Sequence, residues 1–272
     1  MPNARPALLL ALVFAATLSP PLAAATRTAA SRPAAVPAAS SDASVDPDAV
    51  AALARMGKAL RALPHFRLHA TTSTDYVLDD GQKVALAGTV DYKVSGPDRF
   101  FVEIQSEQQH RQLFYDGRQL TIYSPRLKYY ATLDDLNRSS QALLADSAST
   151  YGLEFPLADL FLWGTSAFPT DGFQSALQVG SARIDGEATR QYAFRQPGVD
   201  WQVWISDATA LPRQLVITSH ADPALPTYQA TLQWDTRRAV NASELAFNPA
   251  GATKIVFVPV ALAAQDTPTG GN

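Results

Sequence analysis

Histidine, serine and carboxylate side chains are the groups in this chain that could catalyse a reaction or hold a metal. Of four histidines, His65 and His69 have the four-residue spacing of metal ligands on a helix. However, Pro64 and the alternating residues after it predict a strand, on which four residues span about 13 Å. One metal ion cannot bridge that distance, so we expect no metal site. The chain has no cysteine, which excludes zinc–thiolate sites, iron–sulfur clusters and thiol nucleophiles.

Serine and carboxylate residues are plentiful, but their spacing matches no catalytic motif. Neither a G-x-S-x-G elbow nor a glycine-rich phosphate loop occurs. The DDG at 79–81 lacks the remaining ligands of a calcium loop, and we interpret it as a hairpin turn. Glu103 with Glu107, or Arg195 with Asp200, could form acid–base pairs, but surface charge is the simpler interpretation. We therefore predict no catalytic residue, no cofactor and no enzyme; a hydrolase with dispersed residues is the catalytic alternative.

Aromatic residues are the more informative feature. Trp201 and Trp204, in FRQPGVDWQVWI at 194–205, are an odd number of residues apart and face opposite sides of a strand. Alternation with Val203 assigns Trp201 to a concave interior and Trp204 to the outside. Such residues either pack a core between sheet and helices or line an apolar cavity of the kind that holds a lipid chain. The side chains that we expect to line such a cavity are Leu68, Tyr92, Leu160, Phe161, Trp163, Phe194, Trp201, Val203, Tyr228 and Leu232.

The elements that would position these residues follow from the periodicity. Apolar residues at helical spacing predict a helix at 46–63, with Asp46 as N-cap and Pro47 in its first turn. Alternation with a period of two then predicts consecutive antiparallel hairpins up to residue 133. Helical signals return at 133–151, where Asp134 or Asp135 could be the cap. The remaining predicted elements are an apolar helix at 155–164, strands between 176 and 235, and a last strand at 254–258 that closes the sheet.

This order predicts one α+β domain, residues 46–258. We expect a large curved antiparallel sheet, a half-open barrel, with helices covering its concave face. A chain of 272 residues can bury a full core, and its net charge of −3 argues against binding to nucleic acid.

The N-terminus predicts export. Arg5 precedes an apolar run at 7–18, too short to span a bilayer, followed by prolines and small residues. We predict a signal peptide at 1–25, a disordered Ala/Pro/Ser leader at 26–45 and a disordered tail at 259–272. No other apolar run reaches the roughly 18 residues of a spanning helix, so we expect a soluble protein after cleavage. We also expect it to be a monomer.

Several motifs resemble a known family: DPDAVAALARMGKALRAL, TTSTDYVLDDGQKV, YDGRQLTIYSPRLKYYATL, LADLFLWG and FRQPGVDWQVWI. Together they are similar to domain-of-unknown-function family 2092, predicted periplasmic proteins, over 46–258. That family resembles the lipoprotein carriers LolA and LolB and the sensor RseB. The resemblance implies a periplasmic protein whose helix-covered cavity binds an acyl chain, a lipid or a lipidated protein. The alternative is an envelope protein-interaction or stress-sensing module without a lipid ligand.

Overall fold

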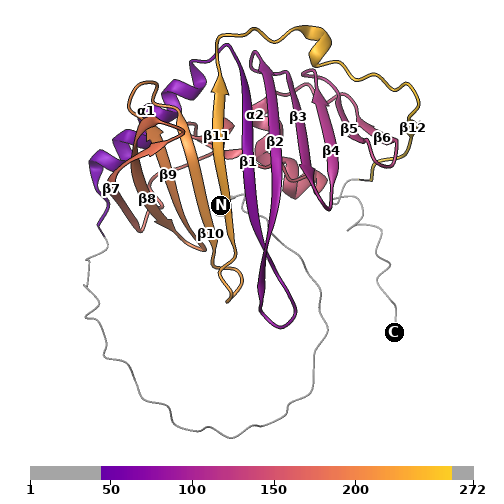
Figure 1. Ribbon diagram of the computed structural model, residues 1–272. Helices are drawn as coiled ribbons and strands as arrows, with labels where there is room; N and C mark the ends of the chain where they lie inside the picture. Colours follow the sequence, from indigo (N-terminus) through magenta and orange to yellow (C-terminus); the bar gives the residue numbers. More distant parts are fainter. Residues whose placement is uncertain (1–43, 259–272) are drawn as a thin grey trace, which may run out of the picture.

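The computed structural model describes residues 44–258. The predicted signal peptide, the predicted tail and all but the last two residues of the predicted leader lie outside the described residues. Within the described part, twelve strands form one curved sheet in the order β12-β6-β5-β4-β3-β2-β1-β11-β10-β9-β8-β7 (Figure 1). Neighbouring strands are antiparallel except at β12–β6. The predicted half-open antiparallel sheet is confirmed.

The bounds of the elements are as follows. The strands are β1 (His65–Val77), β2 (Lys83–Ser95), β3 (Phe100–Ser106), β4 (His110–Tyr115), β5 (Leu120–Ser124), β6 (Tyr129–Leu133), β7 (Ser175–Ile184), β8 (Glu187–Gln196), β9 (Val199–Ser206), β10 (Pro212–Ser219), β11 (Thr227–Asp235) and β12 (Thr253–Lys254). The helices are α1 (Pro47–Arg61), α2 (Ser140–Asp146), the π-helix η1 (Ser147–Tyr151), α3 (Asp159–Leu162) and the 3₁₀-helix η2 (Ala242–Glu244).

The two longest strands show how the alternating sequence builds the sheet. β1 and β2 pair in unbroken register from His65 with Ser95 to Val77 with Lys83. The DDG between them forms the tight turn, in which Gly81 has a φ of 82°. Even-numbered apolar residues such as Leu68 are buried on the concave side, so the predicted two-residue period and the hairpin turn are both confirmed.

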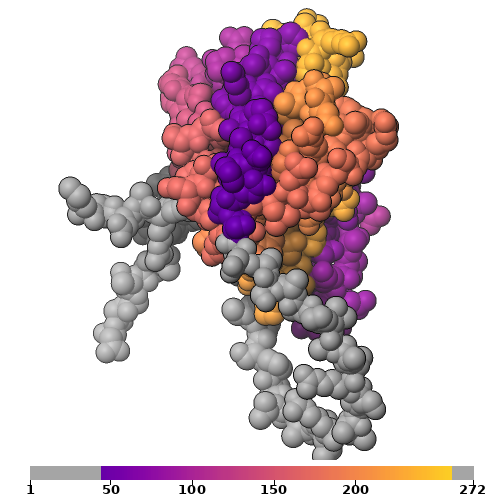
Figure 2. Space-filling model, turned by 90° about the vertical axis from the view of Figure 1, so that its left-hand side faces the viewer, coloured from indigo at the N-terminus to yellow at the C-terminus, as the bar shows by residue number. Residues whose placement is uncertain are grey.

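Helix α1 begins and ends as predicted to within a few residues. The Asp46 side chain accepts a hydrogen bond from the Asp48 backbone N–H at 2.8 Å, and Pro47 follows the cap. The apolar stripe of the helix is buried against the β7 end of the sheet and α3. Figure 2 shows α1, in indigo, as a ridge beside the orange strands of the second half. Gly57 permits this close approach, because a Cβ there would lie 2.9 Å from the Trp163 carbonyl oxygen.

The predicted helix at 133–151 is wrong in its first third. Helix α2 begins only at Ser140, and Ser139, not Asp134 or Asp135, caps it by accepting from the Ala142 N–H. Asp135 and Asn137 have φ values of 58° and 45°, which a right-handed helix does not allow.

The cause of this difference is a tertiary contact. The Tyr115 hydroxyl donates to the Arg138 carbonyl at 2.5 Å, and the Leu136 N–H donates to the Arg118 carbonyl at 2.8 Å. These bonds hold the segment as a loop against the β4–β5 turn. Tertiary hydrogen bonds here override a local helical preference.

The predicted closing strand at 254–258 is also wrong. Only Thr253 and Lys254 pair, in parallel with Tyr129 and Tyr130 of β6, and they lie at an open edge of the sheet (Figure 1). The chain reaches this edge across the convex face, where the guanidinium of Arg67 binds the Glu244 carboxylate at 2.6 Å. The sheet therefore stays open between β12 and β7.

Candidate ligand-binding cavity

A cavity of about 470 Å³ lies between the concave face of the sheet and the segment from α2 to α3. Strands β1, β2 and β3 form its floor, with β10 and β11 at one side, and α2, η1 and residues 153–159 cover it. Tyr76, at its rim, is 36% exposed. The residues that line it are Thr72, Thr74, Asp75, Tyr76, Leu86, Ala87, Gly88, Thr89, Val90, Ile104, Gln105, Ser106, Gln108, Gln109, Leu144, Ser147, Ala148, Leu153, Glu154, Phe155, Pro156, Leu157, Ala158, Asp159, Ile217 and Tyr228.

The cover of the cavity is built from irregular helix. The chain passes from α2 directly into the π-helix η1, which Gly152 ends in the left-handed conformation at φ 66°. The segment then turns back, and Leu153, Phe155 and Leu157 are buried towards the sheet. Leu157 has a φ of 65°, a strained conformation for a residue of this size. Strain of this kind is common where a segment is shaped around a binding site.

Asp159 is the unusual polar group of the cavity wall. It is half-buried, and apart from its own backbone N–H no hydrogen-bond or ion-pair partner approaches its carboxyl in the described part of the chain. Desolvation by the surrounding protein raises the pKa of Asp159 to about 6. A carboxylate held this way is paired with no cation and remains available to a ligand.

Two tyrosines lie near Asp159. The Tyr92 hydroxyl donates to the Pro156 carbonyl at 2.6 Å, so it is already bonded. The Tyr228 hydroxyl is buried and has no hydrogen-bond partner within the described residues. Burial, followed by the Asp159 charge, raises the pKa of Tyr228, so the phenol stays neutral. A buried hydroxyl without a partner costs about 1–3 kcal/mol, which a ligand could recover.

Two further carboxylates line the cavity and differ from Asp159 because each has a cation nearby. Asp75 forms an ion pair with the Lys83 ammonium at 3.1 Å and accepts from the Thr227 N–H at 3.1 Å. Burial raises the pKa of Glu154, and the charge of Arg111 opposes that rise. Asp159 is thus the carboxylate whose charge the protein leaves uncompensated.

The ten residues predicted to line a cavity divide into two groups. Tyr228 lines the cavity described above. The other nine belong to the packed core beside it: Leu68, Tyr92, Leu160, Trp163, Phe194, Trp201, Val203 and Leu232 are buried, and Phe161 packs partly buried against them. Contact of any of the ten with a ligand stays a prediction.

An aromatic stack accounts for several of these core residues. Trp201 lies between Phe194, with ring centroids 4.2 Å apart, and Trp163, with centroids 5.9 Å apart. The Trp201 indole N–H donates to Gln196 at 3.0 Å. Trp201 is buried and Trp204 half-buried, as the alternation predicted. The stack covers β8 and β9 on the concave face, whereas the floor of the cavity is formed by β1, β2 and β3.

Sequence reasoning missed Asp159 as a site residue. It stands alone as a charge inside the apolar run LADLFLWG, and that isolation was the available signal, since an unpaired charge is seldom placed in a buried segment without a role. Of the small residues on the concave face, Gly88 lines the cavity, whereas Ala70 and Ala230 are fully buried in the core.

The other groups singled out from the sequence do not form a site. His69 pairs with Asp91 at 2.8 Å on the convex face, and Arg195 pairs with Asp200 across β8 and β9 at 2.7 Å. Glu103 accepts from Gln112 and pairs with His110 instead of Glu107. No cluster of three or more potential metal ligands occurs in residues 44–258.

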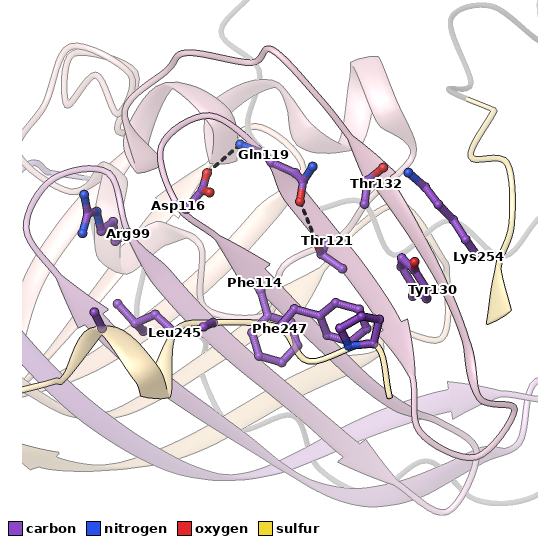
Figure 3. Close-up of a pocket in the computed structure, with 13 residues that line it drawn as sticks. Arg99, Phe114, Asp116, Gln119, Thr121, Tyr130, Thr132, Leu245, Phe247 and Lys254 are labelled. Atoms are coloured by element: carbon purple, nitrogen blue, oxygen red, sulfur yellow. Dashed lines mark hydrogen bonds between the residues drawn. The ribbon is translucent and has the colours of Figure 1, made fainter. Parts of the chain in front are cut away.

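A second hollow, of about 460 Å³, lies on the convex face under the C-terminal segment (Figure 3). Phe247 of that segment contacts the rings of Phe114, Tyr123 and Tyr130, with centroids 4.9–5.4 Å apart. Polar groups at its rim form hydrogen bonds with one another: the Asp116 carboxylate accepts from the Gln119 backbone N–H at 2.7 Å. This hollow is the place where the segment docks on the sheet.

The fold and the cavity define a class: a protein with one open, curved antiparallel sheet whose helices cover a partly apolar cavity. Residues 49–258 match the model of the family described as predicted periplasmic protein (DUF2092). The chain belongs to this family, which places it in the periplasm as the sequence predicted. No helix among residues 44–258 has the length and apolar character needed to cross a membrane.

Several solved structures are similar at low sequence identity. The lipoprotein LppX of Mycobacterium tuberculosis is 14% identical with a TM-score of 0.46, over 72% of this chain and all of that one. A structure of the Pseudomonas aeruginosa MucA/MucB complex is 17% identical with a TM-score of 0.42, over 74% of this chain and 61% of that one. A LolA-superfamily protein of Nitrosomonas europaea is 11% identical with a TM-score of 0.33, over 73% and 97%. No curated protein matches the chain.

Proposed function

We propose that this protein is a non-enzymatic periplasmic carrier that binds the acyl chain of a lipid or of a lipidated protein in its concave cavity. The observation that most supports this proposal is the cavity itself, which has a volume of about 470 Å³ and a mainly apolar wall. A saturated chain gains about 0.8 kcal/mol for each CH₂ moved from water to such a surface. A volume of this size holds a single small ligand of the kind bound in apolar pockets.

Loading of a ligand would require the segment that covers the cavity to move. Helix η1 is a π-helix of five residues that ends at a left-handed glycine, and short π-helical turns are rare and often occur at functional sites. Residues 144–159 contribute much of the lining. Displacement of this cover would admit a chain without disturbing the aromatic core around Trp201.

The experiment is equilibrium binding of a fluorescent acyl-chain probe to the exported chain. Ala148 is half-buried at the cavity wall, and Ala148→Trp places an indole in the cavity. Ser149, the next residue, is exposed and does not line the cavity, so Ser149→Trp is the matched control. We expect the first variant to lose at least about tenfold in affinity and the control to bind as the parent protein does. Equal binding by all three would contradict the proposal.

A second candidate function is interaction with an envelope protein. The edge strand β7 pairs with β8 on one side only, apart from a single bridge from Val45 to Ala176. Leu177 and Val179 of this strand are 44% and 49% exposed. Open edges of this kind accept strands from partners. Site-specific crosslinking from position 179 in cells, with a protein captured and no lipid bound, would favour this function.

A further inference from the structure

We propose that the cavity selects amphiphiles with a positively charged amine head group and discriminates against anionic ones. This inference rests on the acyl-chain function proposed above and specifies the polar end of the ligand. It follows from the charges of the lining, from one uncompensated carboxylate and from one unpartnered hydroxyl.

The lining carries negative charge only. Asp75, Glu154 and Asp159 contribute carboxylates, and no lysine, arginine or histidine is among the described residues that line the cavity. Three cations act from outside the lining: Lys83 pairs with Asp75, the charge of Arg111 acts on Glu154, and Arg126 donates to the Ser106 carbonyl at 2.6 Å. A fatty acid or an anionic phospholipid would therefore bring its charge to a surface that repels it.

Asp159 and Tyr228 form the polar end that a ligand would meet. Both line the cavity, and they are close enough that the carboxylate charge acts on the phenol. The Asp159 carboxylate can accept hydrogen bonds from an ammonium group, and the Tyr228 oxygen can accept another. An amine head group thus satisfies both groups at once, with its hydrocarbon chain against Ile104, Leu144 and Leu153.

Other groups do not compete for this role. Tyr92, facing Asp159 from β2, is held by the Pro156 carbonyl, and the residues of α2 and η1 at the cavity, Leu144, Ser147 and Ala148, carry no charge. The remaining titratable groups at the cavity are Tyr228 from β11, Asp75 and Tyr76 from β1, and Glu154 from the cover. Loss of the Asp159 charge below about pH 6 should weaken the binding of an amine more than the binding of an uncharged ligand.

The test compares dodecylamine, dodecanol and dodecanoate as competitors of the acyl probe at pH 7.5 and low ionic strength. Both the amine and the alcohol can donate a hydrogen bond to the Asp159 carboxylate, but only the ammonium group adds an attraction between opposite charges. We therefore expect the amine to bind roughly tenfold or more tighter than the alcohol. The alcohol should in turn bind tighter than the carboxylate. Asp159→Asn should remove most of the amine's advantage, so that the ratio of the amine and alcohol affinities falls towards one.

The controls separate the two proposals. Asp171→Asn, in an exposed loop, removes a carboxylate that does not line the cavity and should behave as the parent protein. Tyr228→Phe should weaken amine binding by a few-fold while keeping the order of the three ligands. If none of the three amphiphiles binds, the acyl-chain function itself fails. If all bind equally, if the carboxylate binds best, or if Asp159→Asn keeps the preference for the amine, the charge selection is overturned and the acyl-chain function stands.

Discussion

Replacement of Asp159 by asparagine should stabilise the protein at neutral pH, although it removes a side chain of the proposed site. Burial raises the pKa of Asp159 from 3.8 to about 6 in the folded chain. Between these two values the folded state holds a proton that the unfolded state has lost, so stability falls as the pH rises through this window. A shift of about two units corresponds to about 3 kcal/mol lost by pH 7.5.

The assay is urea unfolding of the parent protein and of Asp159→Asn at several pH values. Because the amide carries no charge to desolvate, the variant should be more stable by up to about 3 kcal/mol at pH 7.5. The difference should shrink to near zero at about pH 4, where the folded carboxyl is protonated. Asp171→Asn should show no such trend. A variant less stable than the parent protein at pH 7.5 would refute the reasoning, because it would mean that the Asp159 carboxylate has a favourable partner in the fold.

Three further predictions concern the scaffold. Trp201→Ala should lower the free energy of unfolding, measured in urea, by about 3–5 kcal/mol because it empties the aromatic stack. Trp204→Ala, on the half-buried outer face, should lower it by less than half as much. Equal losses would contradict the assignment of the two faces. Gly57→Ala should lower the free energy of unfolding by about 1–3 kcal/mol, because the new Cβ would lie 2.9 Å from the Trp163 carbonyl oxygen at the end of α3. This cost should exceed the gain that alanine normally brings to a helix. A higher melting temperature for the variant would disprove that contact. Arg67 lowers the pKa of Glu244 to about 2, so the stability contributed by the ionised Glu244 is complete above pH 4.5 and is lost as the pH falls towards 2. The difference in melting temperature between the parent protein and Glu244→Gln should therefore vanish over that range. A constant difference would contradict the ion pair.

Most of the sheet follows from local chemistry. Alternation fixed the inner and outer faces of β1 and β9, and glycine-containing turns such as 79–81 set the hairpins. Where tertiary contacts decide the backbone, local signals fail: the hydroxyl of Tyr115 fixes the loop at 134–139 against its helical preference. The short strand β12 is likewise set by where the C-terminal segment docks on the convex face.

The site was harder to predict than the fold, for a geometric reason. Large aromatic residues such as Trp201 and Phe194 fill space, so they gather where the core is tight. The cavity instead lies where smaller and polar residues, Thr72, Gly88 and Ala148 among them, face a cover built from η1. Alternation identifies the face of a residue but not the distance to the element opposite, and that distance decides between core and cavity.

The measurement that tests the central claim most directly is mass spectrometry of small molecules extracted from the protein after purification from the periplasm under non-denaturing conditions. We predict a co-purifying molecule with a long acyl chain, in near-stoichiometric amount, that is lost from Ala148→Trp and retained by Ser149→Trp. Recovery of no such molecule from the parent protein, or equal recovery from both variants, would contradict the assignment of the concave cavity as an acyl-chain site.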